Sequence, residues 1–222
     1  MTKTNQQKVK DFLINNGVII VMFILVIYTG FTSDNFFTKN NFMNILMNMS
    51  SRLVIALGIA GCVITAGCDL SAGRMIGFGA CISGMLLQRM DYSGKFFPDM
   101  QPLNVFVVAL IAMLVCAAFG TVTGFFIAYL NVPPFIATLA MMEIVYGIGL
   151  IVTNATPLGG YVEQYTNVSN GKFLGINYLI WIAIIVAAIT WFIFNMTRHG
   201  KYMYAIGGNP QAAEVAGVLV KA

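Results

Sequence analysis

The chain has 222 residues, of which 59% are apolar and only 9% are charged, and its formal net charge is +4 at pH 7. An average soluble domain carries roughly a quarter of charged residues. This composition, with a mean hydropathy of +0.82, therefore excludes an ordinary soluble enzyme or a nucleic-acid-binding domain and indicates an integral membrane protein.

Apolar segments of membrane length recur along the chain. A transmembrane helix needs about 20 mainly apolar residues. The uncharged window 100–142 must hold parts of two helices, because Pro133 and Pro134 end one helix and begin the next. We predict an all-α fold, a polytopic membrane helix bundle that forms a single transmembrane domain over 1–222. Six spans are expected within 12–197, at about 12–31, 43–67, 72–88, 103–130, 133–153 and 174–197.

The orientation follows from the distribution of lysine and arginine, which favour cytosolic loops. With a cytosolic N-terminus, both basic clusters fall inside: the lysines of segment 1–11 and the pair Arg198 and Lys201. The first apolar stretch is longer than a signal-peptide core and lacks a small-residue cleavage site, so we expect it to be retained. The sequence thus predicts a cytosolic tail over 1–11 and a cytosolic C-terminal segment.

The second and third spans differ from the others because their uncharged parts, 53–67 and 75–88, are short. Short or interrupted apolar segments often mark a transport pathway, since irregular backbone at membrane depth must be buried in protein or face water. Small residues repeat here at a spacing of four, which allows close helix packing. We therefore expect these helices to be interior. The repeats are Ala56 and Ala60, Gly73 and Gly77, Ala80 and Gly84, and Gly120 and Gly124.

Four residues are candidates for the pathway or its gate: Asp69, Arg74, Glu143 and Tyr146. Asp69 or Ser71 could instead simply cap the third helix. Glu143 lies midway through 133–153, with Tyr146 on the same helical face. An ionisable group at this depth must face a partner, a cavity or water, or be protonated, so Glu143 is either a packed, hydrogen-bonded group or a pathway group. Further polar lining candidates, chosen by polarity and spacing alone, are Asn48, Ser51, Thr65, Ser83, Thr121 and Thr138.

Motifs for catalysis are missing from the sequence. It has no GxxxxGK[ST] phosphate loop, and its single histidine, His199, leaves no Ser/His/Asp set. Four cysteines without a CxxC spacing are expected to be small apolar residues rather than zinc ligands. We therefore expect no catalytic residue, no metal and no cofactor in this chain, and any source of energy must be a different chain.

The last segment, GGNPQAAEVAGVLVKA at 207–222, is too polar to cross a bilayer. Asn209 is a suitable N-cap and Pro210 suits the first helical position. An apolar stripe of Ala212, Val215, Ala216 and Leu219 then favours insertion into a groove of another protein. The alternative is a surface helix that lies along this chain's own bundle.

The sequence resembles the permease subunit of bacterial sugar ABC importers of the ribose, xylose and galactose class, and is most similar to the galactose/methyl-galactoside type. The resemblance covers essentially the whole chain. It is carried by GCDLSAGR (67–74), MDYSGKFFPDM (90–100), AYLNVPPFIATL (128–139), IVYGI (144–148) and AIGGNPQAAEVAGV (205–218).

This resemblance implies that the last segment is the cytosolic coupling helix that docks on an ATPase subunit. The residues that match the family's motif are Gly208, Asn209, Pro210, Ala212, Ala213, Glu214 and Gly217. It further implies a permease homodimer, ATP and Mg bound by the partner ATPase subunit, a periplasmic sugar-binding protein, a monosaccharide substrate and a location in the bacterial inner membrane. Transport would proceed by alternating access.

Two departures from the family are visible. Relatives continue beyond the coupling helix, so we expect this chain to be an N-terminal portion, and Glu143 falls where an apolar residue is expected. Two other functions remain open at this point. One is an ion-coupled secondary transporter or channel that uses Glu143, and the other is a non-transporting scaffold or truncated remnant.

Overall fold

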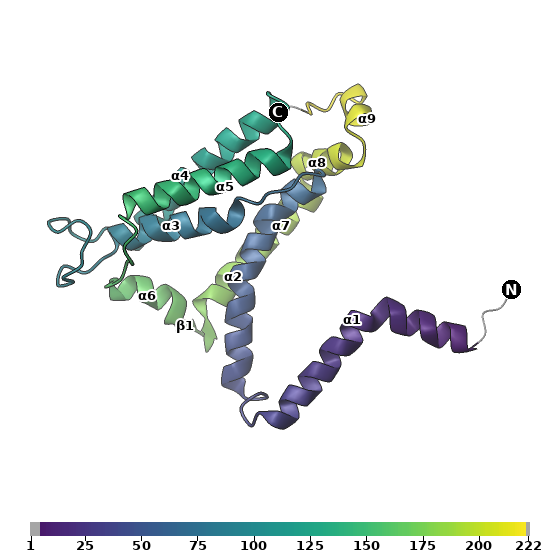
Figure 1. Cartoon of the computed structure of the whole chain (residues 1–222), viewed down its shortest axis with the longest axis horizontal. Helices are drawn as coiled ribbons and strands as arrows, with labels where there is room; N and C mark the ends of the chain where they lie inside the picture. Colours follow the sequence, from purple (N-terminus) through teal and green to yellow (C-terminus); the bar gives the residue numbers. More distant parts are fainter. Residues whose placement is uncertain (1–4, 221–222) are drawn as a thin grey trace. The chain divides into compact units, whose positions relative to one another are not determined.

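The computed structural model describes residues 5–220, and within them the regular elements are helices, a two-stranded hairpin and an isolated bridge between Gln88 and Tyr161, joined by loops (Figure 1). The chain divides into two compact units, 1–48 and 49–222, and the boundary falls within α2. The elements in chain order are α1 (Asn5–Thr32), α2 (Lys39–Ile64), α3 (Ala72–Leu86), α4 (Val105–Ala128), α5 (Pro134–Val152), α6 (Glu163–Asn170), β1 (Lys172–Phe173), β2 (Ile176–Asn177), α7 (Tyr178–Met196), α8 (Arg198–Gly208) and α9 (Pro210–Val215).

The first unit contains α1 and the beginning of α2. The turn between these helices is closed by Asn41, whose Nδ2 donates to the carbonyl of Phe36 at 2.8 Å. Of the predicted cytosolic tail 1–11, residues 1–4 lie outside the described residues, and the remainder already belongs to α1.

The apolar helices coincide in position with the expected spans. Within the described residues, α2, α4, α5 and α7 are long and apolar enough to cross a membrane, whereas the apolar parts of α1 and α3 are shorter. A helix rises 1.5 Å per residue, so the 15 residues of α3 extend about 22 Å and do not reach across a hydrocarbon core of about 30 Å. The expectation of a polytopic all-α membrane protein is confirmed.

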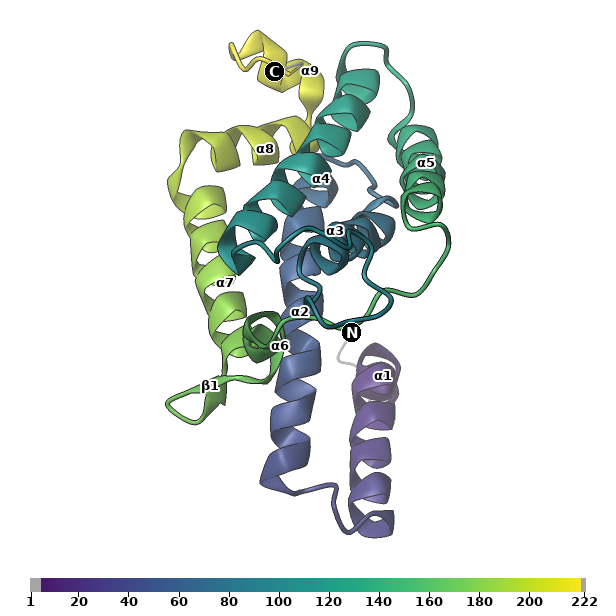
Figure 2. The same ribbon diagram turned by 90° about the vertical axis from the view of Figure 1, so that its left-hand side faces the viewer.

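The core of the second unit lies where α3 packs against both α4 and α5 (Figures 1 and 2). Phe78 of α3 is buried with Met141 and Val145 of α5. Its ring also meets Phe119 of α4 edge to face, with centroids 5.6 Å apart. The α3 helix is therefore the interior helix of this group, as predicted, whereas the same prediction is wrong for α2, of whose described residues only Ser50 is buried.

Two of the four small-residue repeats, Gly73/Gly77 and Gly120/Gly124, do not act as predicted. A side-chain carbon at Gly73, Gly77, Gly120 or Gly124 would meet nothing within 4 Å, so no helix of the described chain approaches these glycines closely. At Gly84 the same carbon would lie 3.1 Å from Leu158, which makes this glycine a close packing position. The spacing alone cannot distinguish a packed glycine from one that faces open space.

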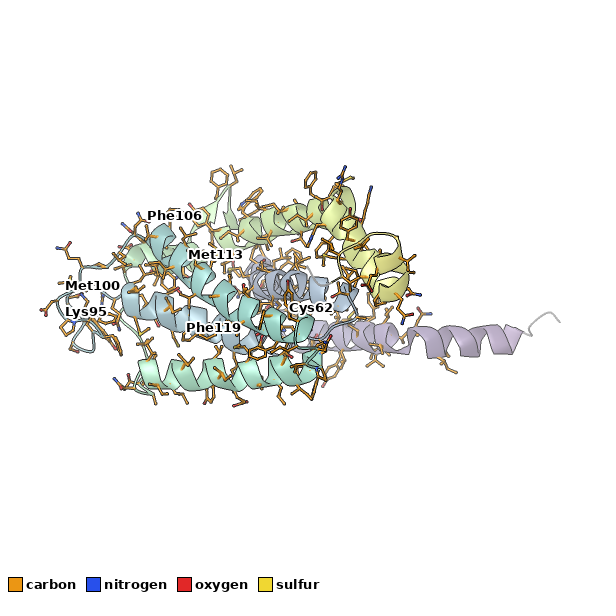
Figure 3. The ribbon with its side chains drawn as sticks, turned by 90° about the horizontal axis from the view of Figure 1, so that it is seen from above. Cys62, Lys95, Met100, Phe106, Met113 and Phe119 are labelled. Atoms are coloured by element: carbon orange, nitrogen blue, oxygen red, sulfur yellow. The ribbon has the colours of Figure 1, made fainter. Side chains whose placement is uncertain are left out.

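At the far end of α3, two loops are joined through Gln88, which is 1% exposed. Its Nε2 donates to the carbonyl of Gly159 at 3.0 Å, and its Oε1 accepts from the amide of Phe96 at 2.7 Å. Lys95 and Met100 lie in the same loop beyond α3, where the Lys95 ammonium donates to the Met100 carbonyl (Figure 3).

The sequence did not predict the small elements between α5 and α7. Leu174 and Gly175 form the tight turn of the β1–β2 hairpin, with φ values of 53° and 78°. Asn177 follows, and its side chain caps α7 by accepting from the amide of Leu179 at 2.9 Å. The expected span 174–197 therefore begins later, at Tyr178, because the chain first completes the hairpin.

Candidate functional site

The connection between α2 and α3 begins with an abrupt helix end. Ala66 has a left-handed φ of 58°. The amide of Gly67 donates to the carbonyl of Cys62 at 2.8 Å, and the amide of Ala66 donates to the carbonyl of Val63 at 3.1 Å. This is the hydrogen-bond pattern of a Schellman motif, in which glycine usually takes the left-handed position. The chain thus leaves the helix sharply after Ile64, and residues 65–71, which we call the α2–α3 break, are not helical.

Asp69 and Ser71 are hydrogen-bonded to each other within this break. Oδ1 of Asp69 accepts from the amide of Ser71 at 2.8 Å and from its hydroxyl at 2.7 Å. Ser71 occupies the N-cap position of α3 but makes no side-chain cap bond, since its backbone is already helical (φ −76°, ψ −21°) instead of extended as in a usual N-cap, and its hydroxyl donates to Asp69. Of the two residues that could cap α3, Ser71 makes no side-chain cap bond, and Asp69 accepts from the amide of Ser71 and so fixes the turn that leads into the helix.

A cavity of about 240 Å³ lies beside the break. Its walls come from the end of α2 and the break, from the last turns of α4 and from the first turns of α5, and they include Thr65, Cys68, Asp69, Gly120, Thr123, Gly124 and Thr138. Thr138 donates to the carbonyl of Cys68 at 3.4 Å and to that of Pro134 at 2.8 Å. Since Thr138 lies in the second turn of a helix that can cross a membrane, the break lies beside that helix rather than beyond its end.

Irregular backbone at membrane depth occurs where it is buried in protein or lines a water-filled space. The break lies against this cavity, which holds one of the four pathway candidates, Asp69. The open glycines Gly120 and Gly124 leave room on the α4 side of the cavity.

Arg74 and Tyr146, two further candidates, are in direct contact. The guanidinium carbon of Arg74 lies 3.9 Å from the centroid of the Tyr146 ring, a cation–π arrangement between α3 and α5. Both side chains remain exposed, Tyr146 by 41%.

Glu143 is exposed on the surface of α5. Among the residues whose side chains the structure describes, none forms a hydrogen bond or an ion pair with its carboxylate. Of the two roles left open by the sequence, the packed, hydrogen-bonded group is therefore not found within this part of the chain.

The C-terminal segment folds as a short capped helix. Oδ1 of Asn209 accepts from the amide of Ala212 at 3.0 Å, and Pro210 takes the first helical position, as predicted. The helix ends in a second Schellman motif: Gly217 has a φ of 84°, and the amide of Val218 donates to the carbonyl of Ala213 at 3.0 Å. Ala213 and Val218 are buried together at this end.

The helix is shorter than the expected segment 207–222, because the Schellman motif ends it and Gly207 and Gly208 belong to α8. Leu219 lies beyond the helix, so the predicted apolar stripe is not continuous along it. Val215 and Leu219 nevertheless remain 91% and 79% exposed, and these side chains are free to contact another protein.

The sequence did not predict α8. It begins directly after α7, where the hydroxyl of Thr197 accepts from the amide of Gly200 at 3.3 Å. Thr197 ahead of a polar stretch was the available signal, since threonine is a favoured N-cap. The α8 helix contacts both α7 and α9 and lies between them in Figure 2.

Comparison with known proteins gives consistent results. Residues 41–222 match the family described as branched-chain amino acid transport system / permease component. The galactose/methyl galactoside import permease protein MglC of Escherichia coli (strain K12) is 40% identical over 99% of this chain and 68% of its own length, and MglC of Haemophilus influenzae has the same identity and coverage. The ribose import permease protein RbsC of Escherichia coli (strain K12) is 31% identical over 95% of this chain and 63% of its own length. No solved structure matches the chain.

Proposed function

The chain belongs to the family of branched-chain amino acid transport system permease components, and we propose that it is the membrane-spanning permease subunit of an ATP-driven monosaccharide importer of the galactose/methyl-galactoside type. The observation that carries the proposal is the 40% identity to MglC along 99% of the chain. The subunit passes sugar by alternating access and has no ATPase site of its own.

The energy comes from a partner ATPase subunit, which binds ATP and Mg. The segment around α9 docks on that subunit, and the residues of this segment have different roles. Asn209 and Pro210 start the helix, Gly217 ends it, and the exposed Val215 and Leu219 supply apolar contact area. Gly208, Ala212, Ala213 and Glu214 complete the docking segment.

The sugar pathway involves the face that carries Arg74, Glu143 and Tyr146 and the cavity that holds Asp69. Charged side chains within apolar helices are costly in lipid and almost always face protein or water. Arg74 and Glu143 are both exposed on this chain, so in the assembled transporter a second permease copy and the aqueous pathway cover them.

The remaining assignments follow from the same function. The chain lies in the bacterial inner membrane with a cytosolic N-terminus, and a periplasmic sugar-binding protein delivers the monosaccharide. A coupling to an ion gradient through Glu143 is the alternative that a transport assay separates, because such uptake persists without ATP and collapses with the gradient.

The test uses the permease with its ATPase subunit and binding protein reconstituted in liposomes. We expect uptake of labelled galactose that requires both ATP and the binding protein. Leu219→Asp should abolish copurification of the ATPase subunit. Leu174→Asp is the matched control, because both leucines are 79% exposed and Leu174 lies on the hairpin that precedes α7. Uptake driven by an ion gradient alone, or equal loss of the ATPase subunit in both variants, contradicts the proposal.

A further inference from the structure

We propose that α8 is a rigid lever that transmits movement of the docked α9 to the α2–α3 break, and that Gly207 is its contact point. This inference rests on the proposed function, since it needs an ATPase subunit that moves α9. It names a positioning residue, Gly207, that acts on the cavity wall through Ile64 and Thr65.

The contact at Gly207 is made by backbone atoms. A side-chain carbon at this position would overlap the carbonyl oxygen of Ile64, the last residue of α2, and would lie 3.4 Å from Cα of Thr65. The backbone of α8 therefore touches the end of α2 at Gly207. One turn earlier in α8, the methyl group of Met203 would lie 3.0 Å from a side-chain carbon at Gly61 of α2, so a second contact joins the same pair of helices.

The other end of α8 is held equally closely. A side-chain carbon at Gly200 would overlap the carbonyl oxygens of Ile193 and Phe194 in α7, and Gly200 is buried. The Thr197 hydroxyl accepts from the amide of the same residue. The helix thus bridges the end of α7 and the end of α2, with backbone against backbone at both ends.

No flexible loop separates this bridge from the docking helix. Asn209 alone connects them: its amide donates to the carbonyl of Ala205 at 3.0 Å as the end of α8, and its side chain caps α9. A displacement of α9 is therefore passed to α8 instead of being absorbed by a linker.

A displacement of α8 at Gly207 reaches the wall of the cavity. Thr65, which Gly207 approaches, lines the cavity together with Cys68 and Asp69. Its hydroxyl donates to the carbonyls of Gly61 at 3.2 Å and Cys62 at 3.0 Å, so it moves with the last turn of α2. Closely packed elements shift as rigid bodies, because packed interiors have low compressibility and transmit strain. A push on α8 consequently displaces the break and changes access to the cavity.

The experiment compares Gly207→Ala with Gly58→Ala in the reconstituted transporter. Gly58 is a glycine of α2 at which a side-chain carbon would meet nothing within 4 Å. The control variant Gly58→Ala therefore adds the same methyl group without a clash. In Gly207→Ala, the sugar transported per ATP hydrolysed should fall about tenfold, within the 5–150-fold span of typical coupling energies. Basal ATP hydrolysis and copurification of the ATPase subunit should remain, and Gly58→Ala should behave as the unchanged protein.

A second readout follows the cavity itself. In a background with Cys62, Cys81 and Cys116 replaced by serine, the exposed Cys68 reports access to the cavity through its rate of reaction with a water-soluble maleimide. ATP should change this rate in the background protein and in Gly58→Ala, but not in Gly207→Ala. If Gly207→Ala does not assemble with the ATPase subunit, Met203→Ala provides a second test, because it removes the other α8–α2 contact without adding atoms. Met203→Ala should lower the transport ratio, the sugar transported per ATP hydrolysed, severalfold.

The outcomes are distinct. A normal transport ratio in Gly207→Ala, together with a normal ATP-dependent change in Cys68 labelling, contradicts the proposal that α8 acts as a lever. The same holds for a fully normal Met203→Ala where Gly207→Ala fails to assemble. Absence of ATP-driven sugar uptake in the unchanged protein overturns the proposed function instead.

Discussion

The guanidinium of Arg74 stacks on the ring of Tyr146 at 3.9 Å, and this pair joins the first turn of α3 to the middle of α5. The stack lies outside the apolar core formed by Phe78, Met141 and Val145. It therefore adds a polar connection between the two helices on a face that the described chain leaves exposed. Because α3 begins directly after the break, the stack influences how firmly the break is held against α5.

Replacing Tyr146 tests this connection. Tyr146→Leu should lower the free energy of unfolding by about 0.5–1 kcal/mol, because an exposed cation–π interaction is lost, whereas Tyr146→Phe should retain most of it. Tyr28→Leu, in α1, is the control for loss of an exposed tyrosine. Thermal unfolding of the purified permease in detergent measures the difference, and equal destabilisation by Leu and Phe at position 146 contradicts the role of the stack.

The cap at Asn209 gives a second prediction. Asn209→Ala removes the acceptor for the amide of Ala212 and should destabilise the start of α9 by about 1 kcal/mol, while Asn209→Asp keeps a capping oxygen. The affinity of the permease for its ATPase subunit should fall severalfold in the alanine variant and stay near normal in the aspartate variant. Equal affinity in all three proteins would show that the order of α9 does not limit docking.

The sequence was sufficient for the apolar helices and for the start of α9, because hydropathy and N-capping are properties of neighbouring residues. Asn209 and Pro210 act as predicted, and α3 is the interior helix of its group. The contacts at the site depend instead on residues far apart in the chain. Nothing local in the sequence indicates that Arg74 meets Tyr146.

The role of individual glycines could not be predicted from the sequence either. Gly207 is the first residue of the polar segment 207–222 in the sequence, yet it is a helical residue of α8 that lies against the end of α2. Gly120 and Gly124 read as packing residues, yet they line a cavity. A glycine allows close approach, but only the tertiary structure determines whether a neighbour is present.

Tyr161, in the segment that follows α5, gives a pH-dependent prediction. Burial raises the pKa of its phenol, and the neighbouring Tyr165 adds to the shift. The hydroxyl donates to the carbonyl of Leu158 at 2.9 Å, and only the protonated form can do so. The stability contributed by this group is therefore complete below the unfolded pKa of about 10 and is lost as the pH rises through the folded value.

Tyr161→Phe removes both the titration and the hydrogen bond. The variant should be less stable than the unchanged protein by about 1 kcal/mol at pH 8–9. The difference should shrink as the pH rises above about 10, because only the unchanged protein loses stability there. Unfolding temperatures measured across this range check the prediction, and a difference that does not change with pH would argue against the titration.

Gln88 connects the loop after α3 to the segment after α5, and it is almost completely buried. Gln88→Leu would leave the amide of Phe96 and the carbonyl of Gly159 without their partner, at a cost of about 1–3 kcal/mol for each group that stays buried. The loop 89–100 should then detach and become accessible to protease. The exposed Gln164 provides the matched control, and cleavage of Gln164→Leu should proceed at the rate of the unchanged protein. If Gln88→Leu is as resistant as that control, the two loops are held together by their backbone bonds, such as the one from Arg89 to Gly160, and not by the glutamine.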